Sequence, residues 1–123
     1  MALKDKLVVE LSMEDLNGSG YYYTNLIFPA TEGQVEDALQ RVRGIGREDN
    51  LEFSVMNYNK LPELKDIRIS GATINELNFF AKRIEMLNEN ETAALKAVFN
   101  KHLESEEIDD WIDIKDMINL TYG

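Results

Sequence analysis

The chain has 123 residues, a length that suits one compact domain or two very small units sharing a core. It carries 13 Lys and Arg against 23 Asp and Glu, a net charge of -10. Nucleic acids and anionic membranes require a basic footprint, so direct binding to either is not expected and a basic partner is favoured. The chain has no cysteine, which excludes disulfides, thiolate catalysis and cysteine-ligated metals.

The N-terminal segment MALKDKLVVELSMED has an apolar run that is too short for a signal peptide or a membrane-spanning helix, and charges interrupt it. We therefore expect a cytoplasmic protein. The next two segments predict an antiparallel β-hairpin. Residues 5–12 and 21–30 are rich in β-branched and aromatic side chains, and Pro29 closes the second segment because proline cannot donate to a strand ladder.

A helix and a third strand are predicted after the hairpin. Thr31 and Gln34 form a capping-box pattern, in which two side chains satisfy two free backbone donors at a helix start. One apolar stripe follows at helical spacing: Val35, Ala38, Leu39 and Val42. Within residues 51–59, Leu51, Phe53 and Val55 alternate with polar side chains, and although Met56 and Tyr58 interrupt this alternation the segment predicts a strand. Residues 1–60 thus read as a β-β-α-β unit.

The second half of the chain has a helical pattern. Thr73 opens another capping box with Glu76. The apolar stripe of this helix contains Ile74, Leu77, Phe80 or Ala81, Ile84 and Leu87. A second helix is expected from Glu91 to about Lys101. Its inward residues are Ala94, Leu95, Val98 and Phe99. Residues 104–123 predict a third helical region with an irregularity near Trp111.

These elements together predict an α+β fold. A small antiparallel three-stranded sheet with one helix, residues 1–60, is followed by a small all-α helical unit, residues 61–123. Residues 60–72 form the natural boundary, and the segment IRIS within them (67–70) has the composition of a short extended stretch.

Residues with catalytic potential are few. The single histidine, His102, lies near the end of a predicted helix, where a solvated imidazole is the common interpretation. The glycine cluster at 44–46 matches no phosphate loop, and DLNGSG (15–20) lacks the ligands of a calcium loop. The tyrosines at 21–23 could stack on bases, but no basic groove accompanies them. We expect no enzymatic activity, no cofactor and no metal.

Acidic residues are densest between residues 104 and 116. This segment carries seven carboxylates and one lysine, Lys115. The carboxylates are Glu104, Glu106, Glu107, Asp109, Asp110, Asp113 and Asp116. On a continuous helix Asp109, Asp113 and Asp116, which are spaced i, i+4 and i+7, would align. Such a surface would steer a basic groove toward the protein, and the alternative is a solvated face that keeps the chain soluble.

Two adjacent aromatic residues, Phe79 and Phe80, cannot both lie in one narrow helical stripe, because neighbouring positions on a helix diverge. One of them is therefore expected to pack against another element, most simply the first unit.

The order of these features resembles the ArdA antirestriction family of conjugative plasmids and transposons. The resemblance rests on a strand ending in IFP before an acidic helix, the strand FSVMNYN, and the helix TINELNFFAKRIEML followed by a second acidic helix. In that family a Glu-Leu-Asn element begins the antirestriction helix. Here the matching residues are Glu76, Leu77 and Asn78. The likeness covers roughly residues 20–120.

This resemblance implies a DNA mimic whose carboxylates stand in for phosphates and occupy the DNA-binding groove of a type I restriction-modification enzyme. The partner-binding residues that it implies, together with the acidic segment, are Glu76, Leu77, Asn78, Glu85, Glu89, Glu91, Glu104, Glu106, Glu107, Asp109, Asp110, Asp113 and Asp116. The family has a third, acidic C-terminal domain, so the chain is expected to be either part of a longer protein or a two-domain relative. The oligomeric state stays open.

A rival interpretation is an interaction or scaffold domain of a conjugative mobile element without antirestriction activity. In that interpretation an apolar surface around Phe79, Phe80 and Trp111 binds a protein partner.

Overall fold

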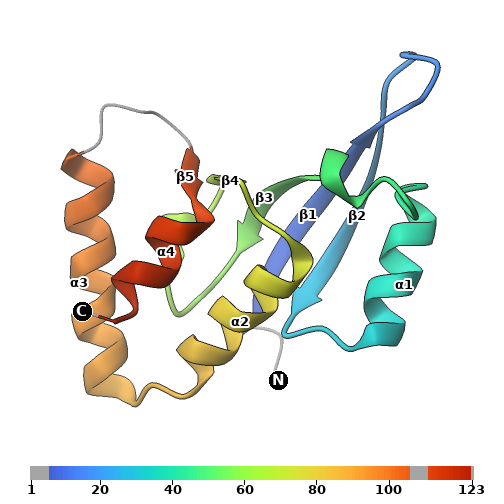
Figure 1. The fold of residues 1–123 in the computed structure, drawn as a ribbon. Helices are drawn as coiled ribbons and strands as arrows, with labels where there is room; N and C mark the ends of the chain where they lie inside the picture. Colours follow the sequence, from blue (N-terminus) through green and yellow to red (C-terminus); the bar gives the residue numbers. More distant parts are fainter. Residues whose placement is uncertain (1–5, 106–110, 123) are drawn as a thin grey trace.

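The computed structural model describes residues 6–105 and 111–122, and in this part of the chain the fold is α+β with a five-stranded mixed sheet (Figure 1). The strands are β1 (Leu7–Glu14), β2 (Tyr21–Phe28), β3 (Glu52–Asn57), β4 (Arg68–Ser70) and β5 (Trp111–Asp113). The helices are α1 (Glu32–Arg41), α2 (Ile74–Glu85), α3 (Glu89–Ser105) and α4 (Ile114–Leu120). Two short 3-10 turns complete the set, η2 (Glu48–Asn50) and η3 (Pro62–Leu64).

The sheet has the order β2-β1-β3-β4-β5. Its first four strands are antiparallel to their neighbours, and β5 runs parallel to β4. The α+β class is confirmed, but the prediction of a three-stranded sheet followed by an all-α unit is wrong. Two short strands from the second half, β4 and β5, extend the sheet that the first half begins.

The helices cover one face of the sheet. In Figure 1, α2 lies in front of the sheet, α1 lies beside β2, and α3 and α4 lie at the other end. Residues alternate along β1, with Leu7, Val9, Leu11 and Met13 fully buried and the residues between them partly open. This period of two places one side of each strand in the core and leaves the opposite side of the sheet open.

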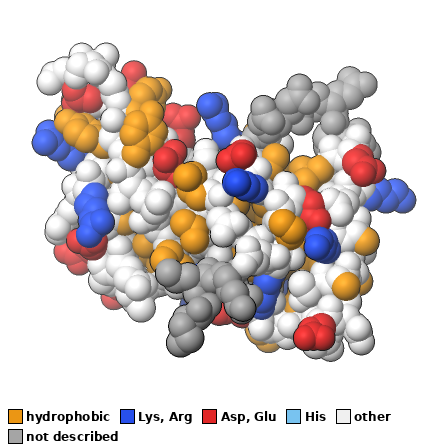
Figure 2. Space-filling model, turned by 180° about the vertical axis from the view of Figure 1, so that it is seen from behind, with side chains coloured by type: hydrophobic (Ala, Val, Ile, Leu, Met, Phe, Trp, Pro, Cys, Tyr) orange, Lys and Arg blue, Asp and Glu red, His pale blue; other side chains and the backbone are white. Residues whose placement is uncertain are grey.

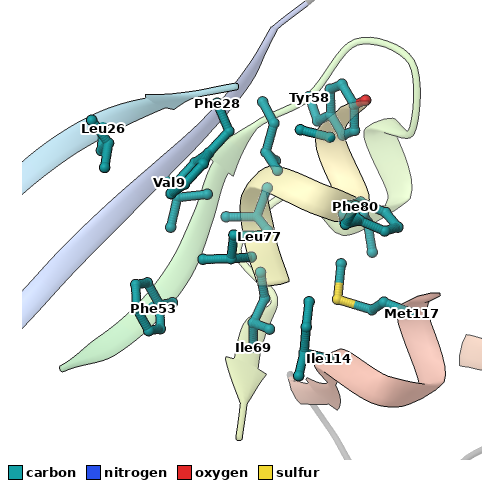
Figure 3. Close-up of a cluster of buried hydrophobic side chains, with 14 of the residues drawn as sticks. Val9, Leu26, Phe28, Phe53, Tyr58, Ile69, Leu77, Phe80, Ile114 and Met117 are labelled. Carbon is teal, nitrogen blue, oxygen red and sulfur yellow. The ribbon is translucent and has the colours of Figure 1, made fainter. Parts of the chain in front are cut away.

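One hydrophobic core joins the two halves of the chain (Figure 3). Val9 and Phe53 of the sheet face the same cluster as Leu77 of α2 and Met117 of α4. The division into units near residue 60 remains a prediction. Tyr58 is buried in this cluster. Its burial is the larger cause that raises the pKa of the phenol, and the negative charge of Glu85 is the smaller one, so the phenol stays neutral at physiological pH.

Both predicted capping boxes are confirmed. Thr31 Oγ1 accepts from the Gln34 amide at 3.2 Å, while the Gln34 side chain accepts from the Thr31 amide at 2.9 Å. Thr73 and Glu76 repeat the arrangement at the start of α2. In α3, Leu95 and Phe99 are buried as predicted, whereas Ala94 and Val98 are exposed because α3 buries a narrower stripe than the sequence suggested.

The third predicted helical region, residues 104–123, is wrong at residues 111–113, and residues 106–110 lie outside the described part of the chain. Trp111–Asp113 form β5, and Ile112 is buried opposite Ile69 of β4. Asp113 then caps α4 by accepting from the Lys115 amide at 2.8 Å. The expected helical alignment of Asp113 with Asp116 therefore does not form, because one residue ends a strand and the other lies in the first turn of a helix.

Candidate functional site

The Glu-Leu-Asn triplet at the start of α2 is the first candidate. Glu76 is the third residue of the helix, and its Oε1 accepts from the Thr73 amide at 3.0 Å and from the Thr73 hydroxyl at 3.1 Å. Leu77 is fully buried beneath the helix, so its side chain is inaccessible to a partner. Two members of the triplet thus serve the fold: one starts the helix and the other fills the core.

Asn78 joins α2 to the segment between β2 and α1. Its Oδ1 accepts from the Ala30 amide at 2.7 Å, and its Nδ2 donates to the Ala30 carbonyl at 3.3 Å. The side-chain amide therefore satisfies both backbone groups of a residue 48 positions earlier in the chain. This contact lies at the cis Phe28–Pro29 bond and the start of α1, and it fixes the first half of the chain against α2.

We expect Asn78→Ala to lower the free energy of unfolding by about 1–3 kcal/mol, because it leaves a partly buried amide and carbonyl without partners. Asn75→Ala is the matched control, since Asn75 is exposed on the same helix. Its effect should stay within about 0.5 kcal/mol. Chemical denaturation of both variants measures the difference, and equal stability would contradict the role assigned to Asn78.

Three further predicted residues are engaged in local structure. Glu85 forms an ion pair with Lys6 at 2.9 Å. Glu91 accepts from the Asn88 amide at 2.9 Å, while its own amide donates to Asn88 Oδ1 at 2.8 Å, as in a capping box at the start of α3. Asp113 caps α4, as described above. These carboxylates are partly or fully exposed, yet their geometry is explained by the fold.

The remaining predicted carboxylates divide into two groups. Glu89, Glu104 and Asp116 are exposed on α3 and α4. Because a helix rises 1.5 Å per residue, Glu89 and Glu104 lie about 22 Å apart along the axis of α3. The other four lie outside the described residues: Glu106, Glu107, Asp109 and Asp110. The structure thus does not gather the described members of the predicted set into one compact site.

A cleft of about 840 Å³ lies between α1, the ends of β3 and β4, and the start of α2. Its apolar lining includes Val35, Leu39, Leu51, Phe53, Ile69, Ala72, Ile74 and Trp111. Three carboxylates, Glu48, Asp49 and Glu52, line it together with the single cation Arg68. The exposed Trp111 side chain adds an aromatic surface. This combination suits a basic partner that also carries apolar groups.

The open face of the sheet continues this region. A polar hollow of about 360 Å³ is lined by Glu10, Ser12, Tyr21, Tyr23, Glu52, Ser54 and Arg68. Glu52 and Arg68 therefore line both hollows. Seen from behind (Figure 2), Lys and Arg side chains are interspersed with Asp and Glu and with hydrophobic groups, so this side is not uniformly acidic.

The sequence analysis did not select the cleft residues Glu48, Asp49 and Glu52. The one local signal among them is the alternation of β3, in which Glu52 is exposed and the next residue, Phe53, is buried on the other face of the strand. The cleft itself combines elements that are distant in sequence, so no spacing pattern could identify it.

No group of metal-binding side chains occurs among residues 6–105 and 111–122. Within the same residues, none of the helices has the length and apolar character required to cross a membrane. No family model, curated protein or solved structure matches this chain.

Proposed function

We propose that this chain is a non-enzymatic acidic binding module that occupies the basic DNA-binding groove of a type I restriction-modification enzyme. The observation that carries the proposal is the excess of carboxylates, 23 Asp and Glu against 13 Lys and Arg, of which few in the described part of the chain are held in ion pairs. Between described residues, Lys and Arg form two ion pairs, Lys6 with Glu85 and Arg41 with Asp37. Most carboxylates of the described chain thus remain available to a cationic surface.

Electrostatic attraction supports binding of this acidic chain to a DNA-binding groove. Proteins that bind DNA present Lys and Arg to a dense row of phosphates, and a carboxylate surface can satisfy the same cations. The contributing groups are the exposed Glu89, Glu104 and Asp116, the carboxylates of the cleft, and the acidic segment 104–116. The resemblance to ArdA proteins supplies the class of partner.

The test is direct binding to a purified type I methyltransferase at two salt concentrations. We expect the dissociation constant to rise at least about tenfold between 50 and 200 mM salt, because counter-ions screen the charges on both surfaces. Isothermal titration calorimetry measures the dissociation constant at both salt concentrations. Binding that is insensitive to salt would contradict charge-driven recognition.

A second candidate is a protein-interaction domain of a mobile element, and the apolar cleft beside Trp111 favours it. In that function, Trp111→Ala abolishes binding while salt has little effect. Phe79→Ala is the matched control, since Phe79 is equally exposed and does not line the cleft. The buried Phe80 cannot belong to such a surface and Phe79 does not line the cleft, so of the apolar patch predicted from sequence only Trp111 lies there.

A further inference from the structure

Strand β2 forms one edge of the sheet and has an unusual composition. Its eight residues, YYYTNLIF, contain no charged side chain, although 29% of the whole chain is charged. The pairing with β1 runs from Leu7 opposite Phe28 to Glu14 opposite Tyr21 without a bulge. Natural proteins protect long edge strands with lysines, prolines, bulges or a covering element, because an unprotected edge pairs with other chains.

The hydrogen-bond alternation of the sheet identifies the backbone groups on this edge. The Val55 amide donates to the Ile67 carbonyl, and the Val55 carbonyl accepts from the Asp66 amide, both at 2.8 Å. The backbone groups of Val55 therefore point toward β4, and those of the preceding residue, Ser54, point toward β1. Bonding directions alternate along each antiparallel strand, so Val9, opposite Val55, turns its groups toward β2.

The same alternation in β2 turns the amides and carbonyls of Tyr21, Tyr23, Asn25 and Ile27 outward. Between described residues, these four accept and donate no backbone hydrogen bond beyond the strand. The side chains of Tyr21, Tyr23 and Asn25 are exposed. At these positions no other described strand pairs with the edge.

We propose that two copies of this chain pair through their β2 strands in an antiparallel arrangement. With Thr24 on the two-fold axis, Tyr23 lies opposite Asn25 of the second copy, and Tyr21 lies opposite Ile27. Every outward residue then has a partner, which gives about eight backbone hydrogen bonds across the interface. The Tyr–Ile pairs are of the aromatic and β-branched kind that stabilises neighbouring strands.

The lack of charged side chains on β2 is what allows a second copy of like charge to approach this edge. Two chains of net charge -10 repel one another, and β2 offers eight successive positions where no carboxylate or cation enters the contact. The opposite edge of the sheet is less suited to pairing between like-charged copies, because β5 has three residues and one of them is the charged Asp113. Screening of the repulsion by salt should strengthen this dimer. Binding of a basic groove responds to salt in the opposite direction, so this inference stands or falls independently of the proposed function.

Sedimentation velocity of the full chain, over a range of concentrations at 50 and 500 mM NaCl, tests the dimer. We expect a monomer–dimer equilibrium that shifts toward dimer at high salt. Asn25→Pro removes one outward amide, at an edge position that tolerates proline, and should raise the dissociation constant at least roughly tenfold. Asn25→Ala keeps the amide and should retain the dimer.

Two measurements separate lost pairing from lost folding. Circular dichroism must show the native spectrum for Asn25→Pro, and Asn25→Lys provides a second edge variant with the same expected loss. Hydrogen exchange at the amides of Tyr21, Tyr23, Asn25 and Ile27 should slow as the protein concentration rises. A monomer under every condition, or a dimer that Asn25→Pro and Asn25→Lys leave intact, would overturn the proposal.

Discussion

Phe80→Ala is expected to lower the free energy of unfolding by about 3–5 kcal/mol, whereas Phe79→Ala should cost less than about 1 kcal/mol. The two phenylalanines are adjacent on α2, yet Phe80 is fully buried and Phe79 is 44% exposed. Phe80 packs edge to face against Phe99 of α3, with 6.2 Å between ring centroids. Such a pair adds stability beyond the burial of its area.

Truncation at Phe80 also leaves a cavity where the sheet-facing helix meets α4, beside Leu77 and Met117 (Figure 3). Urea denaturation followed by circular dichroism measures both variants, with the slope of the transition compared to exclude a change in the unfolded state. Equal destabilisation by the two substitutions would contradict the packing of α2 described here.

Local signals predicted much of this fold. Thr31 with Gln34 and Thr73 with Glu76 each act within one helical turn, so four residues suffice to identify the helix start. The alternation of β1 likewise identifies its buried face without knowledge of its neighbours. The aromatic pair in α2 was predicted to diverge, and Phe80 is the member that entered the core.

The extended stretch predicted at residues 67–70 is confirmed, since β4 spans Arg68–Ser70, but β5 and its pairing with β4 could not be predicted in the same way. Arg68 of β4 lies opposite Trp111 of β5, more than 40 residues later in the chain. Each strand has three residues, which is too short for a periodic signal, and burial of Ile69 and Ile112 adds to the hydrogen bonds that pair the strands. Residues 104–123 were therefore predicted to be helical throughout, with an irregularity near Trp111.

The candidate site was harder to predict than the fold. Glu76, Leu77 and Asn78 were selected as binding residues, but their side chains cap a helix, fill the core and hold Ala30. A residue triplet in a sequence does not distinguish these structural roles from a surface role. The cleft carboxylates Glu48 and Asp49 become neighbours of α2 only after the chain has folded.

A competition experiment has the largest expected effect on function. A carboxylate surface that substitutes for DNA phosphates and the DNA itself cannot occupy one groove together, so the two ligands must exclude each other. Titration of this chain should release nearly all of a labelled duplex from the methyltransferase at low salt, and far less at moderate salt. Neutralising Glu106, Glu107, Asp109 and Asp110 to their amides should weaken the release.

The matched control neutralises Glu32, Glu36 and Asp37 of α1 and adds a fourth change at Glu63, which alters the net charge by the same amount outside the acidic segment and the cleft. If neutralising the acidic segment weakens duplex release more than this control does, the contact lies in the acidic segment and the effect is not one of total charge.

The most direct single measurement is fluorescence anisotropy of the labelled duplex bound to the methyltransferase, at 50 mM salt, as this chain is added. Occupation of the groove predicts a fall in anisotropy to the value of free DNA. Anisotropy that stays at the bound value through saturating protein would contradict DNA mimicry by this chain.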